Sequence, residues 1–268
     1  MPSRWTMLEQ ELDRWARAGM VASFWWRDDD ATEDSPALGR LLELAGGVGA
    51  PVALAVVPAP ARPTLSRAFA RDGIWALLHG YAHLNHAPPS AKKAELGPHR
   101  PNDVMLAELK DGLRRLRDLT PRALPVLVPP WNRISPALVP RLSGQGIRGL
   151  SGYGPRPSAQ AAPDLALVNT HVDIIDWAHG RAFVGEDWAL DLALAHLCRR
   201  RGGTVDRDEP TGLITHHLAH DEACWRFVRS FVGRTAGHPA ACWLAADLVF
   251  AGLGREQPAA VGQGMGGA

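Results

Sequence analysis

The residues best suited to chemistry are two histidines and a run of three aspartates. His79 and His83 are four residues apart, a spacing that places two imidazoles on one side of a helical turn, where both can reach one ion. Neutral imidazole suits zinc and other borderline divalent metals. Asp28, Asp29 and Asp30 are consecutive and repel one another unless a cation compensates their charge. An aspartate with two histidines leaves metal positions open for water and substrate, as a catalytic site requires.

Both groups also have structural explanations. The histidines could lie in a solvated turn, and the aspartates could cap a helix, since Asp34 and Ser35 follow them closely. A cap accounts for one aspartate but not for three that directly follow an apolar segment. His86 comes three residues after His83 and could lie near the same side of the turn.

Short apolar segments alternate with stretches of helical spacing along the chain. Strands are predicted at residues 23–26, 52–57, 74–78, 124–128, 172–175 and 212–215. Helices are predicted at residues 6–19, 38–45, 103–119, 136–143 and 187–200. Such alternation favours a parallel sheet covered by helices, either open or closed into a barrel.

Polar residues follow these predicted strands where they end. The segments concerned are Asp28–Asp30, His79 with His83, Pro129–Arg133, Asp176–Trp177 and His216–His217. The carboxyl ends of parallel strands meet at one edge, and active sites of barrels and open sheets assemble there. The sequence therefore predicts that these segments form one site.

The composition is typical of a soluble globular protein. The chain has 268 residues, a formal net charge of +1 and no clustered basic face, which argues against a nucleic-acid binder. Its three cysteines are widely spaced and are expected to be buried free thiols. No signal peptide or membrane span is visible, so we expect a cytoplasmic location without membrane association. We predict one domain over residues 1–253 and a disordered, Gly-rich tail over residues 254–268.

Five motifs in order resemble those of the polysaccharide deacetylases, the NodB-like carbohydrate esterases. The likeness spans about residues 23 to 220 and is specific because the whole ordered set is present. The resemblance implies an α/β fold, a distorted or incomplete (β/α) barrel. The motifs are Asp29-Asp30-Ala31, His79 with His83, Val128-Pro129-Pro130-Trp131, Asp173 to Trp177, and Ile214-Thr215-His216.

The chain departs from the family pattern in two motifs. Arg27-Asp28 precedes the aspartate pair where the family has Thr-Phe, and Ala31 replaces a glycine. Val128 occupies the place of an arginine that in the family orients the catalytic aspartate. Arg133, five residues later, is a candidate substitute. These departures indicate a divergent member.

The resemblance assigns roles to the first, second and last motifs. Asp30, His79 and His83 are predicted to hold one divalent ion, with zinc the first expectation and cobalt, nickel or manganese also suited to such ligands. Asp29 is the predicted general base; in a regular strand it faces away from Asp28 and Asp30, so a bend must turn it inward. His216 is the predicted general acid.

Two alternatives for the catalytic residues remain open, and a helix is expected to begin nearby. Asp28 is the alternative base, and His217 is the alternative acid, because adjacent strand residues face opposite sides. His220 and Asp221 are expected to open the next helix, with Asp221 as its N-cap.

The remaining motif residues are predicted to bind the substrate or to support the site. Trp131, with Pro130 beside it, and Trp177 are expected to line the substrate groove, because aromatic faces stack on sugar rings. Arg133 and Asp176 are expected to orient catalytic residues; Asp173 is the alternative to Asp176, and either could instead cap a turn.

The function predicted from these roles is metal-dependent hydrolysis. The expected substrate is a carbohydrate-like molecule from which an N- or O-acetyl group is removed. One alternative keeps the same metal site for a small non-sugar amide. Another is a non-catalytic carbohydrate-binding or regulatory protein on a degenerate scaffold, for which the loss of the motif arginine at Val128 is the best support.

Overall fold

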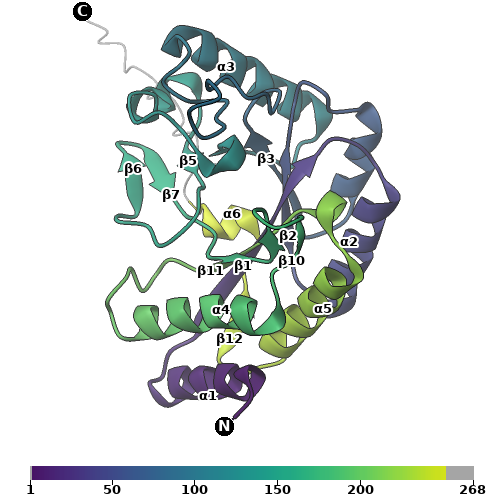
Figure 1. The fold of residues 1–268 in the computed structure, drawn as a ribbon, viewed down its shortest axis with the longest axis vertical. Coiled ribbons are helices and arrows are strands. Elements are labelled where there is room, and N and C mark those ends of the chain that lie inside the picture. The colour runs from purple at the N-terminus through teal and green to yellow at the C-terminus, as the bar shows by residue number, and fades with distance from the viewer. Residues whose placement is uncertain (1, 252–268) are drawn as a thin grey trace, which may run out of the picture.

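The computed structural model describes residues 2–251, so the predicted tail at residues 254–268 lies outside the described residues. One sheet dominates the fold, and its strands follow the order β6-β7-β5-β4-β3-β2-β1-β11-β8, with β12 also paired to β1. Every pairing in it is parallel except that of β6 with β7. The sheet curves without closing on itself, which confirms the predicted distorted α/β barrel (Figure 1).

The strands of this sheet are mostly short. Their bounds are β1 Ala22–Ala31, β2 Val52–Val56, β3 Ile74–His79, β4 Ala123–Val128, β5 Gly149–Leu150, β6 Gln160–Ala162, β7 Leu165–Leu167, β8 Val172–Asp173, β11 Thr211–Thr215 and β12 Ala241–Trp243. A separate antiparallel hairpin pairs β9 (Ile175–Asp176) with β10 (Ala182–Phe183).

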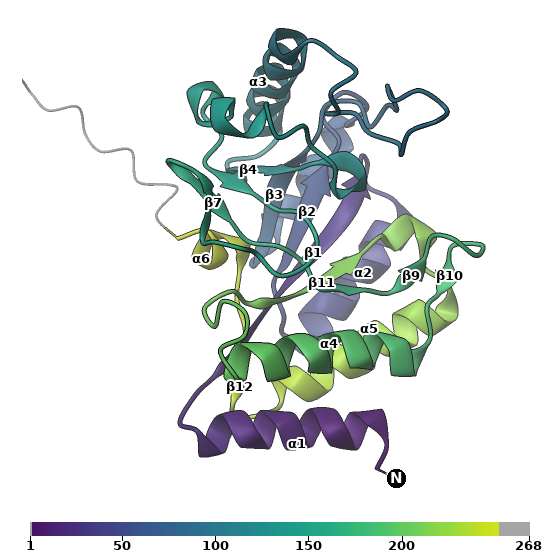
Figure 2. The ribbon, with the colours of Figure 1, turned by 60° about the vertical axis from the view of Figure 1, so that its left-hand side comes forward.

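Helices cover the outer face of the sheet. They are α1 Arg4–Arg17, α2 Pro36–Val48, α3 Asn102–Leu119, α4 Glu186–Arg201 and α5 Glu222–Ala236. Figures 1 and 2 show α1 lying along α4, with α2 and α5 beside each other and α3 at the far end of the sheet. Within residues 2–251, no helix combines the length and apolar character needed to cross a membrane.

The two faces of β1 enter different apolar clusters. Phe24 and Trp26 belong to the large core between the sheet and the helices. Trp25 faces the concave side, where it packs edge-on against Phe250, which follows the short helix α6 (Ala246–Val249). This second cluster fills one end of the concave side with apolar side chains and leaves the carboxyl ends of the strands for polar residues.

β1 does not end where the sequence predicted. It continues through all three aspartates to Ala31, and its pairing with β2 shifts register between Asp28 and Ala31. Asp30 has φ 72°, in the left-handed region that residues with a side chain seldom adopt. This irregularity is a bulge, and it changes the direction of Asp30. Asp29, which we expected a bend to turn inward, instead stays on the same face of β1 as Arg27.

The predicted helix at residues 136–143 is wrong. Two short 3-10 turns occupy this part of the chain, η3 (Val139–Arg141) and η4 (Ser143–Gln145). Pro140 has no amide hydrogen to donate to a helix, and Gly146 ends the second turn at φ 80°. The apolar spacing was real, because Leu138 and Leu142 are buried, but it belongs to these turns.

The cysteines only partly match the prediction. All three thiols are free, yet Cys224 alone is buried, while Cys198 is exposed and Cys242 is intermediate.

Asp221 caps α5 as predicted, since its Oδ1 accepts a hydrogen bond from the Cys224 amide at 2.8 Å. Asp221→Ala should lower the free energy of unfolding by about 1 kcal/mol, because two amide donors lose their acceptor. Urea denaturation of the variant measures this change. The exposed Glu43 on α2 provides the control: Glu43→Ala should change the unfolding free energy by less than about 0.5 kcal/mol. Equal midpoints for the two variants would contradict the capping role.

Candidate functional site

A cleft of about 640 Å³ opens at the carboxyl ends of the strands. It lies where the sequence predicted that polar segments would meet. Eight of the ten predicted site residues line it: Asp29, Asp30, His79, His83, Trp131, Arg133, Trp177 and His216.

 

The other two predicted site residues, Pro130 and Asp176, do not line the cleft. Four further residues complete the lining: Asp173, the predicted alternative to Asp176, and Lys93, Asn132 and Arg181, to which the sequence assigned no role.

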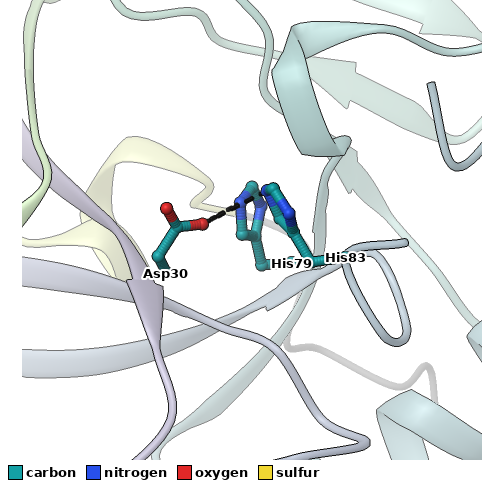
Figure 3. Close-up of side chains that lie close together, drawn as sticks. All are labelled: Asp30, His79 and His83. Carbon is teal, nitrogen blue, oxygen red and sulfur yellow. Dashed lines mark hydrogen bonds and ion pairs between the residues drawn. The ribbon is translucent and has the colours of Figure 1, made fainter. Parts of the chain in front are cut away.

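Asp30, His79 and His83 converge at the floor of this cleft (Figure 3). Oδ1 of Asp30 lies 3.1 Å from Nε2 of His79 and 3.3 Å from Nε2 of His83. His79 donates a hydrogen bond from Nδ1 to the carbonyl oxygen of Val128 at 2.9 Å, so in the neutral ring Nε2 carries the lone pair. This lone pair faces a carboxylate oxygen, and two acceptors in that position need a cation between them. The donor set therefore fits a divalent metal.

The charges around these ligands favour an ionised Asp30 and positive charge beside it. Burial would lower the pKa of His79, but the neighbouring carboxylates of Asp29 and Asp30 raise it above its ordinary value. Burial likewise opposes ionisation of Asp30, yet the hydrogen bond and charge of His79 lower the pKa of Asp30 far below its usual range. The site thus keeps a carboxylate ionised beside imidazole nitrogens.

The turn that carries the two histidines is not helical. Gly80 has φ 59° and His83 has φ 55°, so the chain bends sharply directly after β3. A Cβ atom on Gly80 would lie 2.0 Å from Oε2 of Glu95 and 2.6 Å from Cγ of Pro130, distances that only glycine permits. The predicted shared face comes from this bend. His86 is exposed and is not part of the cleft lining.

Pro130 and Glu95 support this bend from below. Pro130 is buried against Gly80, so the prediction that it binds the substrate is wrong. Glu95 is also buried, and its carboxylate accepts hydrogen bonds from the amides of Tyr81 at 3.2 Å and Ala82 at 2.7 Å. This role could not be predicted from the sequence, because Glu95 lies in a loop with no motif around it.

Asp29 forms a buried, two-pronged ion pair with Arg27. Nε of Arg27 donates to Oδ1 at 2.8 Å, and Nη2 donates to Oδ2 at 3.0 Å. Arg27 also donates to the side chains of Ser151 at 2.7 Å and Asn132 at 3.0 Å, which fixes its guanidinium. Planar pairing of this kind orients a carboxylate more strictly than a single contact does.

Arg133 does not substitute for the family arginine. Its Nη1 donates to the backbone carbonyl of Lys93 at 2.8 Å, at the rim of the cleft. The partner of Asp29 is Arg27, two residues earlier on the same face of β1. The Arg-x-Asp spacing is compatible with this pair, because residues two apart in a strand share a face. The family pattern does not predict it, since its arginine belongs to the third motif.

His216 is the histidine that faces the cleft. Its Nε2 lies 4.0 Å from Oδ2 of Asp29, and its ring meets the indole of Trp177 edge-on at 4.6 Å. His217 instead pairs with Asp28 on the opposite side of β1, through a hydrogen bond of 2.5 Å from Nδ1 to Oδ1. His217, the alternative acid, and Asp28, the alternative base, thus pair with each other outside the cleft.

The carboxylate beside His216 is Asp173, not Asp176. Asp173 lines the cleft, and its Oδ2 accepts a hydrogen bond from the indole of Trp177 at 2.9 Å. Burial raises the pKa of Asp173. Asp176 accepts hydrogen bonds from the amides of Ala178 and His179 and orders the turn between β9 and β10. The prediction that Asp176 supports catalytic residues is therefore corrected to the turn-capping alternative.

Trp131 lines the cleft beside His83. Its ring centroid lies 4.4 Å from that of His83. Trp131 and Asn132 have φ values of 57° and 54°, two consecutive left-handed residues in the short turn η2 (Pro130–Asn132). Such backbone strain persists only where the surroundings hold it, and here the side chain of Asn132 accepts the hydrogen bond from Arg27.

A second cluster, His171, His196 and Glu209, is fully buried elsewhere in the fold, but its hydrogen bonds do not suit a metal. Nδ1 of His171 accepts a hydrogen bond from the Gly212 amide at 3.0 Å, so Nε2 of the neutral ring carries the proton. Nε2 lies 3.3 Å from Oε2 of Glu209, close enough for an ion pair but without a hydrogen bond. The His171 and His196 rings are stacked 3.4 Å apart, and nearly parallel rings cannot aim their nitrogens at one ion. The cluster is a structural hydrogen-bond group.

Comparison with solved structures identifies the fold. An overlay with a protein from Mycobacterium smegmatis assigned as a polysaccharide deacetylase gives a TM-score of 0.65 at 16% identity, over 87% of this chain and 90% of that one. A family 4 acetyl xylan esterase from Clostridium thermocellum, in complex with a cobalt ion, gives 0.54 at 12% identity, over 85% and 90% of the two chains. The fold is that of the polysaccharide deacetylases.

A third similar structure shows that this fold also occurs without activity. It is a pseudoenzyme of carbohydrate esterase family 4 from Bacillus anthracis, with a TM-score of 0.51 at 12% identity, over 82% of this chain and 63% of that one. The sequence itself matches no protein-family model and no curated protein. The likeness therefore rests on the fold, and the function has to be argued from the residues of the cleft.

Glu95→Gln should weaken the binding of added zinc or cobalt by about 10- to 100-fold, because a glutamine oxygen can serve only one of the two amides and the turn that carries His83 loosens. Competition with a chromophoric chelator measures the affinity. The matched control is Glu43→Gln on the exposed face of α2, which should bind metal as the unaltered protein does. Unchanged affinity in Glu95→Gln would show that the turn holds without this carboxylate.

Proposed function

We propose that this protein is a metal-dependent hydrolase that removes an N- or O-acetyl group from a carbohydrate-like substrate. The observation that carries the proposal is the position of Asp29 in the cleft, with Arg27 fixing its carboxylate and His216 4.0 Å away. A pure binding protein has no need of an oriented carboxylate and an imidazole beside a metal-ligand set. The absence of the family arginine at Val128 no longer favours a non-catalytic protein, because Arg27 pairs with Asp29 instead.

Asp30, His79 and His83 would hold the metal, with zinc the first choice and cobalt, nickel or manganese compatible with the same ligands. When bound, a divalent ion supplies Lewis-acid chemistry: it polarises a carbonyl and lowers the pKa of a water. Asp30 neutralises part of this charge, and the carbonyl of Val128 fixes the His79 ring through Nδ1. Val128 therefore contributes through its backbone, although its side chain is not the family arginine.

In this proposal, Asp29 accepts the proton of the attacking water. The pair with Arg27 holds both carboxylate oxygens, so the base cannot rotate away from the cleft. Each oxygen retains a further lone pair that can accept a proton while the ion pair persists. Because Arg27 is buried, the orientation does not depend on solvent.

In the same proposal, His216 donates a proton to the leaving amine or alcohol. An imidazole has a pKa near operating pH and can both hold and release a proton there. Trp177 limits the movement of the ring from one side, and the indole itself is fixed by Asp173. Trp131 and Trp177 offer two aromatic walls against which a sugar ring can stack.

The purified protein should bind one equivalent of a divalent metal, and His79→Ala/His83→Ala should lose it, because two of three ligands are gone. Elemental analysis after dialysis against zinc measures the content. His86→Ala is the control, since His86 is an exposed histidine of the same loop that does not line the cleft. A protein that takes up neither zinc nor cobalt would contradict the proposal.

Asp29→Asn should lower kcat for acetate release by at least about 100-fold without loss of bound metal, because the amide cannot accept the water proton. Arg27→Lys should lower kcat by about 100-fold, since one ammonium cannot hold both oxygens of Asp29. The assay measures acetate released from acetylated sugar oligomers, with small cyclic and linear amides tested in parallel. Turnover of the amides alone would replace the carbohydrate substrate in the proposal.

Arg229→Lys, on the exposed face of α5, is the control for Arg27→Lys and should retain full activity. Circular dichroism of each variant separates lost activity from lost folding. A metal-bound protein that hydrolyses none of these substrates would point to the non-catalytic alternative.

A further inference from the structure

Three cations line the cleft without a carboxylate partner. Lys93 lies in the loop between β3 and α3, Arg133 follows η2, and Arg181 lies in the turn between β9 and β10. Across the described part of the chain, none of the three takes part in an ion pair, although the cleft also contains three aspartates. Figure 2 shows the β9–β10 hairpin projecting from one side of the sheet.

The aspartates of the cleft are all committed to other groups. Asp29 pairs with Arg27, and Asp30 lies against His79 and His83. Asp173 accepts hydrogen bonds from the indole of Trp177 and from the Ile175 amide. None of these carboxylates therefore forms an ion pair with a cation of the rim.

Two of these cations are held in place by their surroundings. Arg133 donates through Nη1 to the carbonyl of Lys93 at 2.8 Å, which joins two rim segments and leaves the guanidinium other N–H groups to donate. Arg181 lies 5.9 Å from the ring centroid of Trp177, over the aromatic wall, and its backbone has φ 58°. A group stacked on Trp177 would therefore pass close to a cation.

We propose that the substrate of this cleft carries an anionic group, a carboxylate or a phosphate, and that Lys93, Arg133 and Arg181 bind it. The proposal rests on the hydrolase function above and narrows its substrate to an anionic acetylated sugar. Arginine and lysine donate charge-assisted hydrogen bonds to both kinds of anion, and cations around a concave site raise the local concentration of anionic ligands. A divalent metal held by Asp30, His79 and His83 would add positive charge to the same cleft.

The test compares three sugars that share one acetamide: N-acetylglucosamine, N-acetylmuramic acid with an added carboxylate, and N-acetylglucosamine 6-phosphate. With the metal-loaded protein, kcat/KM should be at least about tenfold higher for one or both anionic sugars than for the neutral one. The preferred anion identifies carboxylate or phosphate. The preference should shrink as ionic strength rises, because salt screens exposed charges.

Lys93→Gln, Arg133→Gln and Arg181→Gln should each reduce the ratio of anionic to neutral kcat/KM by about two- to fivefold. Lys92→Gln removes the same charge from the neighbouring residue, which is exposed and does not line the cleft, and should leave the ratio unchanged. A ratio near one in the unaltered protein, with acetate still released, would overturn the inference and leave the hydrolase function standing.

If the protein hydrolyses none of the three sugars, their binding affinities test the inference. Calorimetric titration of the metal-loaded protein with the three sugars should then show tighter binding of an anionic sugar, weakened in the three rim variants but not in Lys92→Gln. Because these variants retain all metal ligands, that pattern separates rim contacts from direct binding of the anion to the metal. Equal affinities for all three sugars would overturn the inference by itself.

Discussion

Three adjacent carboxylates on one strand are the constraint on which the site depends. Their mutual repulsion must be relieved, and β1 does so by giving each a different partner. Asp28 turns toward the helices and pairs with His217, Asp29 turns toward the concave side and pairs with Arg27, and the bulge brings Asp30 round to His79 and His83. Without the bulge, Asp28 and Asp30 would share one face, and the base and the metal ligands could not meet in one cleft.

Much of this arrangement follows from the sequence. Short apolar segments ending in polar residues predicted a parallel sheet with a site at its carboxyl edge, and the sheet and the cleft lie as expected. The choice of His216 over His217 could not come from the pattern, because adjacent residues differ only in which face they present. It follows from the pairing of β11 with β1, which sets Thr215 opposite Asp28. Long-range register of this kind is not encoded locally.

The residues whose roles were not predicted from the sequence support turns of the backbone. Glu95 fixes a turn 13 residues away by accepting amide hydrogens, a role that any acceptor at the right place could fill. Pro130 and Asp176 belong to motifs, yet they support turns, because a motif marks a segment and not the direction of each side chain. The prolines and glycines of residues 136–146 interrupt a helical spacing that the apolar residues alone suggested.

Arg27 and Asp29 lie on the same face of one strand, two residues apart. An arginine on a separate loop would let the orientation of the base change whenever that loop moved. Here the anchor and the base lie on one central strand, on which Arg27 is paired with β2 on one side and with β11 on the other. Loops around the cleft other than those that carry Ser151 and Asn132, which hold Arg27, are thus able to differ in length and composition without disturbing the base. The rim formed by these other loops can change its specificity independently of the chemistry at the floor.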